Sequence, residues 1–233
     1  MIYLKTFKLS DVRNKNTNIH PYNIFRGKEP DVFVFENITV LYGNNGAGKS
    51  TILNLIAHKL NLKGKERVNV PVVGVVPYFE EFAENCTYTL GMNELGMTYK
   101  MLPSGSRYIK SEEILYEIRK LQQDAVLQES VESNLARERG LKNAKYLLDE
   151  PEVSLSPQNQ VELAKKINEM ARLLGVQFII ATHSPFMLGI LNAKIYNLDT
   201  DDYKIQKWSE LENVRYFYDF FKSKENEFWK KDD

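Results

Sequence analysis

The sequence lacks the features that mark secreted and membrane-spanning proteins. It contains a single cysteine, Cys86, so no disulfide can form within the chain, and no charged and then apolar leader opens it. Long apolar runs are also missing, because the longest, such as those at 69–79 and 178–182, fall well short of the roughly 20 residues that span a bilayer. We therefore expect a cytoplasmic protein that does not itself cross a membrane.

The chain also lacks an excess of charge of either sign. Its 31 lysine and arginine residues equal its 31 aspartate and glutamate residues in number, which gives no electrostatic reason to expect nucleic acid or an anionic membrane over the whole surface. A length of 233 residues suits one core with a modest inserted piece. We predict one domain over 1–233, with a helical insertion over 80–144 that forms a lid.

Hydrophobic periodicity predicts alternating strands and helices. Residues 2–10 alternate between apolar and polar, whereas 49–60 is apolar on nearly every side, as in a helix packed under a sheet. Ser156 and Pro157 are typical of a helix start, and Gly175 of a helix end. This order predicts an α/β fold with a largely parallel sheet, antiparallel edge strands and right-handed crossovers. Further strands are expected within 32–43, 70–77, 144–150, 176–184 and 193–199.

The strongest motif is GNNGAGKS at 43–50, which matches the pattern G-x-x-x-x-G-K-S between a predicted strand and a predicted helix. Such a loop folds tightly at its glycines, so that backbone N–H groups and the helix N-terminus surround nucleotide phosphates. Lys49 is expected to contact the β and γ phosphates, and the Ser50 hydroxyl to bind Mg²⁺. The expected nucleotide-binding residues are Gly43, Asn44, Asn45, Gly46, Ala47, Gly48, Lys49, Ser50 and Thr51.

Two acids end a later apolar strand, in YLLDEPE at 146–152. Asp149 is expected to hold Mg²⁺, and Glu150 to act as the general base on the attacking water. His183, in ATHSP, follows another apolar strand, from which its side chain can hydrogen-bond the γ phosphate. Tyr22 lies upstream of the glycine-rich loop, as expected of an aromatic residue that stacks on adenine.

The order of GNNGAGKST, YLLDEPEVSLSP and QFIIATHSP resembles that of ABC-type ATPase heads, and among them the stand-alone bacterial group of AAA, RecF-like and SMC-like ATPases. The resemblance implies a P-loop NTPase fold, ATP and Mg²⁺ as ligands, and an ATP-dependent homodimer. It covers residues 2–60 and 145–220. By this resemblance, Gly43 to Ser50 form the Walker A loop, Asp149 and Glu150 the Walker B pair, Ser154 to Ser156 the D-loop, and His183 is the switch histidine.

Two parts of the family pattern match poorly. In an ABC pair the second subunit offers a signature loop rich in serine and glycine, which the resemblance puts roughly twenty residues before the Walker B aspartate. Ser130 to Ser133 stand there, with Val131 in place of a glycine that would let backbone approach phosphate. PSGSR, Pro103 to Arg107, has the right composition at another distance, and both segments stay candidates. In place of a Q-loop glutamine, Glu80 and Glu81 follow the strand expected over 70–77.

Several functions fit these motifs. The preferred one is hydrolysis of ATP to ADP and phosphate, coupled to nucleic-acid maintenance or defence. An ATP-binding switch that recruits a partner protein with little turnover is suggested by Val131. An ABC transporter subunit would carry a clear LSGGQ loop and a Q-loop glutamine, and a small kinase would use an arginine-rich lid, for which Arg137 and Arg139 are available.

The C-terminal run at 215–229 interleaves aromatic residues with charge, which is compatible with base stacking. Apolar residues at helical spacing favour instead a helix that docks on the body. The expected buried face of this helix carries Leu211, Val214, Phe217 or Tyr218, and Phe221.

Overall fold

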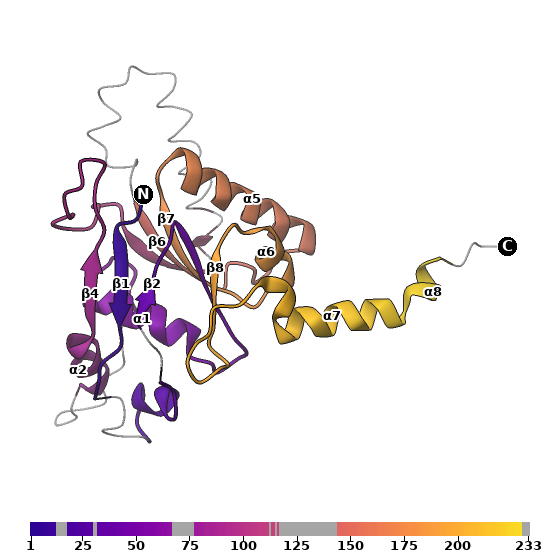
Figure 1. Ribbon diagram of the computed structural model, residues 1–233, viewed down its shortest axis with the longest axis horizontal. Helices are drawn as coiled ribbons and strands as arrows, with labels where there is room; N and C mark the ends of the chain where they lie inside the picture. The colour runs from indigo at the N-terminus through magenta and orange to yellow at the C-terminus, as the bar shows by residue number, and fades with distance from the viewer. Residues whose placement is uncertain are drawn as a thin grey trace, which may run out of the picture.

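The computed structural model describes residues 1–12, 18–29, 32–66, 77–111, 113–114, 116 and 144–229. Its centre is a sheet of five parallel strands in the order β5-β6-β7-β3-β8 (Figure 1). The α/β fold with a parallel sheet is therefore as predicted. The strands are β3 (Ile38–Tyr42), β5 (Arg107–Lys110), β6 (Lys145–Asp149), β7 (Gln177–Ala181) and β8 (Lys194–Asn197).

Three antiparallel strands form a second sheet in the order β2-β1-β4. They are β1 (Leu4–Lys8), β2 (Phe33–Val34) and β4 (Thr87–Leu90). The sequence patterns indicated neither β4 nor β5, which both fall within the expected insertion at 80–144. Both strands are four residues long, and β4 is largely exposed, so neither has the apolar run that marks a buried strand.

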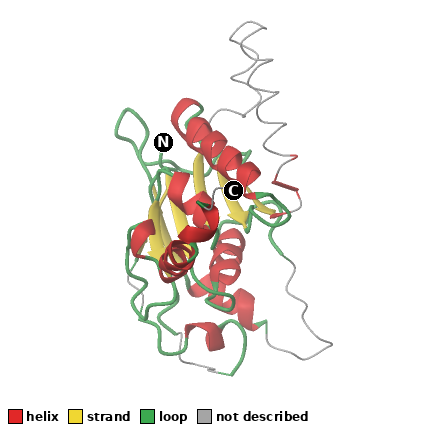
Figure 2. Ribbon diagram, turned by 90° about the vertical axis from the view of Figure 1, so that its right-hand side faces the viewer, coloured by secondary structure: helices red, strands yellow, loops and turns green. Residues whose placement is uncertain are grey.

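Helices cover both faces of the parallel sheet, as all-parallel sheets require (Figure 2). Neighbouring side chains of β6 point to opposite faces, so Leu147 packs in the core that contains α1 and Leu148 in the core that contains α5 and α6. The helices are α1 (Lys49–Lys59), α2 (Tyr78–Asn85), α5 (Pro157–Leu173), α6 (Pro185–Ile190), α7 (Glu212–Ser223) and α8 (Glu225–Phe228), with 3₁₀ turns η1 (Tyr22–Phe25) and η2 (Trp208–Glu210).

Helix α5 begins and ends where the sequence predicts. The Ser156 side chain accepts a hydrogen bond from the backbone N–H of Asn159 at 3.3 Å, and Pro157 is the first helical residue. Gly175, just beyond the end, has φ 63°, a conformation that glycine adopts without strain. Capping chemistry and apolar spacing were sufficient here because both are local. Its predicted apolar face is buried at Leu163, Ile167 and Met170.

The predicted C-terminal helix exists as α7, but the prediction that it docks along its length is wrong. Leu211 and Val214 are buried, whereas Phe217, Tyr218 and Phe221 are 45%, 56% and 51% exposed. After its first turn α7 runs away from the body (Figure 1). Apolar spacing predicts a helix with an apolar face, but it does not show which element, if any, lies against that face.

Two other predicted elements lie wholly or mostly outside the described residues. These are the 117–143 part of the helical insertion predicted over 80–144 and the strand expected over 70–77, and α2 begins directly after Pro77. None of the helices in the described part of the chain is long and apolar enough to cross a membrane.

Gln177 joins the two sheets. Its side chain is fully buried, and its Oε1 atom accepts hydrogen bonds from the backbone N–H groups of Tyr3 at 3.0 Å and Leu4 at 2.9 Å. Its Nε2 atom donates to the carbonyl oxygens of Leu4 at 2.9 Å and Glu36 at 3.1 Å. One amide at the start of β7 thus satisfies backbone groups of β1 and of the turn before β3.

We expect Gln177→Ala to lower the free energy of unfolding by about 2 kcal/mol or more, because a buried donor or acceptor without a partner costs about 1–3 kcal/mol. Urea unfolding followed by circular dichroism measures this. Gln158→Ala, at an exposed position of α5, is the control and should change stability by less than about 0.5 kcal/mol. An equally small change for Gln177→Ala would show that the sheets are joined mainly by apolar packing.

Candidate functional site

All five strands of the central sheet run in one direction, so their carboxyl ends meet at one edge. The glycine-rich loop follows β3, and Asp149 is the last residue of β6. Thr182 and His183 follow β7, and Lys110 ends β5 in register with Asp149. The predicted site residues, which are far apart in the sequence, therefore lie along a single edge.

The loop at 43–50 needs its glycines for two different reasons. Gly48 is the N-cap of α1 with φ 91°, and a Cβ there would lie 2.5 Å from Cγ2 of Ile24. Gly46 has φ 87°, and a Cβ there would meet nothing within 4 Å. Both glycines adopt a left-handed backbone, and Gly48 in addition permits close packing against Ile24, whereas the space beside Gly46 is open.

Lys49 is the first residue of α1 and is 4% exposed. Its Nζ atom donates to the carbonyl oxygens of Gly43 at 2.9 Å and Asn44 at 3.2 Å, and it lies 3.8 Å from Oε1 of Glu150. The ammonium group is thus held across the mouth of the loop by backbone carbonyls.

The Ser50 hydroxyl donates to Oδ1 of Asp149 at 2.9 Å, which links the first turn of α1 to the end of β6. Thr51 follows in the same helical turn. Within the loop, the N–H of Ala47 donates to the carbonyl oxygen of Asn44 at 3.1 Å. Asn45, at the exposed tip, completes the predicted set.

Tyr108 on β5 is a site residue that the sequence did not reveal. Its ring is 2% exposed, and its hydroxyl lies 2.8 Å from Oδ2 of Asp149 and 3.0 Å from Oε1 of Glu66. The hydroxyl has one proton, so it can donate to one of these carboxylates at a time. Lys110 Nζ lies 2.6 Å from the same Glu66 oxygen. The pairing of β5 with β6 brings Tyr108 and Lys110 to Asp149, whereas Glu66 is held by hydrogen bonds to Asn54 and His58 of α1.

The carboxyl group of Asp149 is buried. It is 7% exposed, and burial raises the pKa of its carboxyl group above the ordinary value, although the hydrogen bonds from Tyr108 and Ser50 act in the opposite direction. Such a carboxylate gains from a nearby cation. Hydroxyl and carboxylate oxygens are the ligands that Mg²⁺ prefers.

Glu150 lies one residue beyond the strand and differs from Asp149 in exposure and backbone. Its side chain is 35% exposed, and its φ of 49° is a left-handed conformation that is uncommon outside glycine. Its N–H donates to the carbonyl oxygen of Ala181 at 2.9 Å. The chain thus turns sharply after β6, and the second carboxylate is accessible to water whereas the first is not.

Glu152 is a second residue whose place the sequence did not indicate. It is 7% exposed, and its Oε1 atom accepts hydrogen bonds from the Thr182 hydroxyl at 2.7 Å and the His183 N–H at 3.1 Å. Nδ1 of His183 lies 3.5 Å from the same oxygen. The last acid of YLLDEPE therefore holds the backbone of the predicted switch histidine and lies beside its ring, although Nδ1 makes no hydrogen bond.

The predicted D-loop is held to this histidine segment by Gln160. Its Nε2 atom donates to the carbonyl oxygen of Leu155 at 2.9 Å, and its Oε1 atom accepts from the Ser184 hydroxyl at 2.6 Å. Ser154 in this loop has φ 66°. The Gln160 side chain therefore connects the predicted D-loop to the segment that follows β7.

Asp199 and Asn213 hold the start of the glycine-rich loop. The N–H of Asn44 donates to Oδ1 of Asp199 at 2.9 Å, and Nδ2 of Asn213 donates to Oδ1 of Asn44 at 3.2 Å. Asn213 is in the first turn of α7. The C-terminal helix therefore begins beside the loop.

Three expectations about the site need correction or fall outside the described residues. Tyr22 cannot stack on adenine in this structure, because it is 1% exposed and its ring packs against Phe82 at 5.1 Å. Glu80 and Glu81 lie on α2, which packs near the C-terminal end of α1, where Lys59 Nζ donates to the carbonyl oxygen of Glu84. Glu80 and Glu81 therefore lie near the end of α1 that is distant from the glycine-rich loop.

The segments with Ser130 to Ser133, Arg137 and Arg139 lie outside the described residues.

The second signature candidate, Pro103 to Arg107, leads into a strand and not into a helix. Its Ser106 is 5% exposed, and the Ser106 hydroxyl oxygen accepts from the N–H of Lys145 at the start of β6. This serine is therefore at the amino edge of the sheet, opposite to Asp149.

We expect Asp149→Asn to raise the unfolding temperature of the nucleotide-free protein at neutral pH. The raised pKa of Asp149 means that the fold favours the protonated form; this contribution is present below the ordinary pKa and is lost as pH rises through the raised one. The difference from the wild type should therefore narrow toward about pH 4. Scanning calorimetry at several pH values measures it.

Asp202→Asn, with an exposed side chain, is the matched control and should leave the unfolding temperature nearly unchanged. If Asp149→Asn unfolds at a lower temperature at neutral pH, the hydrogen bonds from Ser50 and Tyr108 outweigh the cost of burial.

Residues 114–188 match the family model of an AAA ATPase domain. This segment includes Asp149, Glu150 and His183 but not the glycine-rich loop. No curated protein matches the sequence. Among solved structures, the chain is similar to cbiO1 from Clostridium perfringens, part of the ABC transporter complex cbiONQ, at 16% identity, with 94% of each chain covered and a TM-score of 0.48. It is also similar to the SMC head domain from Thermotoga maritima, at 13% identity over 84% of this chain and 94% of that chain, with a TM-score of 0.43.

Proposed function

We propose that this chain is a Mg-ATP-dependent ATPase of the ABC type that converts ATP to ADP and phosphate. The supporting observation is that Lys49, Ser50, Asp149 and Glu150 meet at one sheet edge, with Ser50 Oγ 2.9 Å from Asp149 and Lys49 Nζ 3.8 Å from Glu150. Phosphoryl transfer to water depends on positioning and charge stabilisation by such groups. The similarity of residues 114–188 to an AAA ATPase domain supports the same activity.

The oxygen atoms of Ser50 and Asp149 fit a magnesium ion. Proteins usually hold Mg²⁺ by one or two carboxylates together with substrate phosphates and water. Asp149 is buried and its oxygens accept from two hydroxyl groups, so a cation would offset its charge. When bound, Mg²⁺ supplies positive charge to the β and γ phosphates.

The lysine and the exposed glutamate have complementary tasks. Lys49, whose ammonium group donates to two backbone carbonyls at the loop mouth, contributes a point charge to the β and γ phosphates. Glu150 is half-exposed and accepts a proton from the attacking water as a general base. His183 is held through its backbone N–H, which donates to Glu152, and its ring, 43% exposed, hydrogen-bonds the γ phosphate.

The assembly and coupling follow from the resemblance to ABC-type heads. Two copies would sandwich nucleotide, each contributing a signature segment to the other's γ phosphate. The same resemblance favours coupling to nucleic-acid maintenance or defence. A change in turnover on addition of duplex DNA would support that coupling.

An ATP-binding switch with little turnover is the second candidate. It is favoured by Val131 in the first signature candidate and by the strand that follows Pro103 to Arg107 in the second. A signature loop works at a helix N-terminus, where free backbone N–H groups can bind phosphate.

We expect the purified protein to release phosphate from ATP with a specific activity that rises with protein concentration. Glu150→Gln should lower turnover by roughly 10²- to 10⁴-fold while nucleotide binding is kept, because only the general base is lost. Lys49→Ala should lose nucleotide binding as well. Phosphate release and the fluorescence of a labelled ATP analogue measure the two properties separately.

Glu169→Gln, at an exposed position of α5, is the control and should behave like the wild type. Nucleotide binding without turnover in the wild type would reject the hydrolase and leave the switch. Absence of binding, with no difference for Lys49→Ala, would reject both.

We expect Tyr108→Phe to change the Mg²⁺ concentration that gives half-maximal nucleotide binding by about tenfold, because it removes a hydrogen bond that orients a metal-binding carboxylate. The ring packing is kept, but Oδ2 of Asp149 loses its hydrogen bond from Tyr108, so the free energy of unfolding should fall by about 1–3 kcal/mol. Titration of Mg²⁺ at fixed labelled nucleotide measures the effect without turnover. Tyr88→Phe, on β4 and 40% exposed, is the control. An unchanged Mg²⁺ titration for Tyr108→Phe would limit Tyr108 to a packing role.

A further inference from the structure

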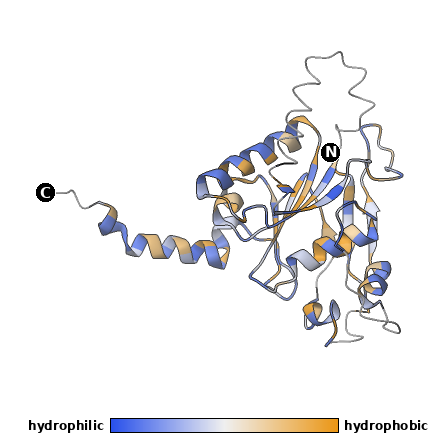
Figure 3. Ribbon diagram, turned by 180° about the vertical axis from the view of Figure 1, so that it is seen from behind, coloured by the Kyte–Doolittle hydropathy of each residue, from blue (hydrophilic) through white to orange (hydrophobic). Residues whose placement is uncertain are grey.

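The segment from Glu212 to Trp229, here called the arm, is anchored by the buried Val214 and is otherwise largely uncovered in the described part of the chain. From Arg215 onward every described residue is exposed. Figures 1 and 3 show α7 and α8 projecting from the body, with apolar positions along them. A surface of this kind marks an interaction site. Seven aromatic side chains are at least 45% exposed: Tyr216, Phe217, Tyr218, Phe220, Phe221, Phe228 and Trp229.

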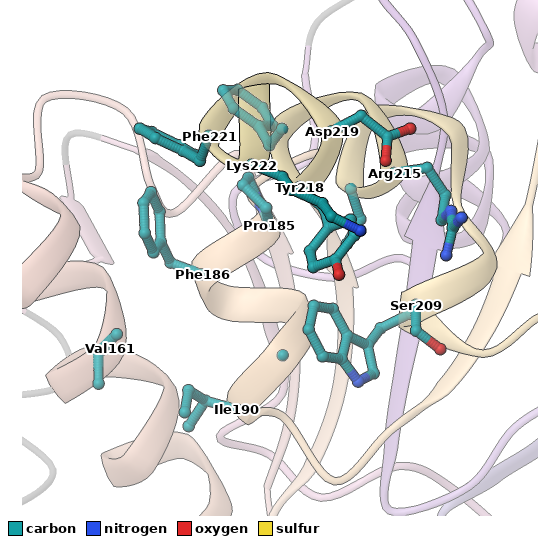
Figure 4. Close-up of a pocket in the computed structure, with 14 residues that line it drawn as sticks. Val161, Pro185, Phe186, Ile190, Ser209, Arg215, Tyr218, Asp219, Phe221 and Lys222 are labelled. Atoms are coloured by element: carbon teal, nitrogen blue, oxygen red, sulfur yellow. The ribbon is translucent and has the colours of Figure 1, made fainter. Parts of the chain in front are cut away.

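The aromatic residues of α7 belong to two faces. Phe217, Tyr218 and Phe221 line a groove of about 820 Å³ that α7 forms with α5, α6 and η2 (Figure 4). Tyr216 and Phe220, four residues apart, share another side of the helix and do not line the groove. This pair is the outer face.

A stripe of alternating charge runs along α7. Glu212, Arg215, Asp219 and Lys222 are spaced by three, four and three residues, and all are exposed. None of the ion pairs found among the described residues joins two of these four; Arg215 and Lys222 instead lie over the Tyr218 ring, at 5.8 and 5.7 Å from its centroid. Arg215, Asp219 and Lys222 lie at the edge of the stripe that also lines the groove, where Figure 4 draws them with Tyr218 and Phe221.

A charge stripe of this kind is complementary to the same stripe on a second α7 helix that runs in the opposite direction. If a second α7 lies antiparallel to the first, with Phe217 at the centre, Arg215 faces Asp219 and Glu212 faces Lys222. A parallel arrangement would place like charges together. Antiparallel pairing of two identical surfaces is the geometry of an isologous two-fold dimer.

We propose that the arm joins two copies of this chain, with the outer faces of two α7 helices packed antiparallel and the charge stripes paired beside them. Tyr216 and Phe220 then leave water together with their counterparts. The same arrangement carries Phe228 and Trp229 of one copy toward the groove of the other, which is lined in part by Trp208, itself 45% exposed. This is recognition of a helix by an apolar groove.

The charge of the arm favours a second copy over other occupants. The arm contains four acids, Glu212, Asp219, Glu225 and Glu227, and three bases, Arg215, Lys222 and Lys224. Nucleic acid and anionic membranes bind surfaces with an excess of positive charge. The arm has no such excess, whereas its alternating pattern fits itself.

This association needs no nucleotide and is distinct from the sandwich dimer of the proposed function. The two are nevertheless connected, because Asn213 at the root of the arm donates to Asn44 in the glycine-rich loop.

The test is sedimentation velocity of the full chain without nucleotide over a concentration series. A dimer is expected. Arg215→Asp and Asp219→Arg should each weaken it by about tenfold, since each converts two symmetry-related attractions into repulsions. The combined swap should return the dissociation constant to within about twofold of the wild type, because the attractions are re-formed in reverse.

Tyr216→Ser combined with Phe220→Ser should abolish the dimer, whereas Met101→Ser, at an exposed apolar residue elsewhere, should leave it intact. A wild type that stays monomeric at every concentration would overturn the inference. Equal dissociation constants for the single-charge variants and the combined swap would also overturn it. A wild type that stays monomeric and binds only added duplex DNA or anionic vesicles would do the same. Nucleotide binding by each variant, measured in parallel, shows whether its fold is kept and tests the proposed function separately.

Discussion

The hydrogen bond from Ser50 to Asp149 is the constraint on which the site depends. It joins the start of α1 to the end of β6, two elements about one hundred residues apart in the chain. The bond is available because parallel strands end at one edge and because the glycine-rich loop turns α1 back under the sheet. Lys49 and Glu150, the neighbours of this pair, lie 3.8 Å apart for the same reason.

Around this bond the structure holds each segment of the candidate site by a buried or part-buried polar side chain. Tyr108 holds Asp149, Glu152 holds the turn after β7, and Gln160 joins that turn to the predicted D-loop. Because these groups are shielded from water, leaving any of them without a partner costs more than on the surface. The network therefore orients side chains at an edge where the strands themselves have already ended.

The remainder of the chain positions this edge. Gln177 attaches the antiparallel sheet at the opposite end of the strands, and apolar packing covers both faces of the parallel sheet. The arm departs from this scheme, since its aromatic residues leave the body at Arg215. Its root at Asn213 is nevertheless bonded to the glycine-rich loop, so the exposed arm begins beside the candidate site.

Local chemistry in the sequence determined the glycine-rich loop, the capped helix α5, the buried strands β6 and β7, and the acids that end β6. Each of these follows from spacing, capping or an apolar run within about ten residues. Only the tertiary structure decided the places of Tyr108, Glu152 and Asn213, because their partners lie on strands and turns distant in the chain. It also decided that Tyr22 is buried and that α7 is uncovered. Periodicity reports which face of an element is apolar, but what lies against that face depends on the packing of the whole chain.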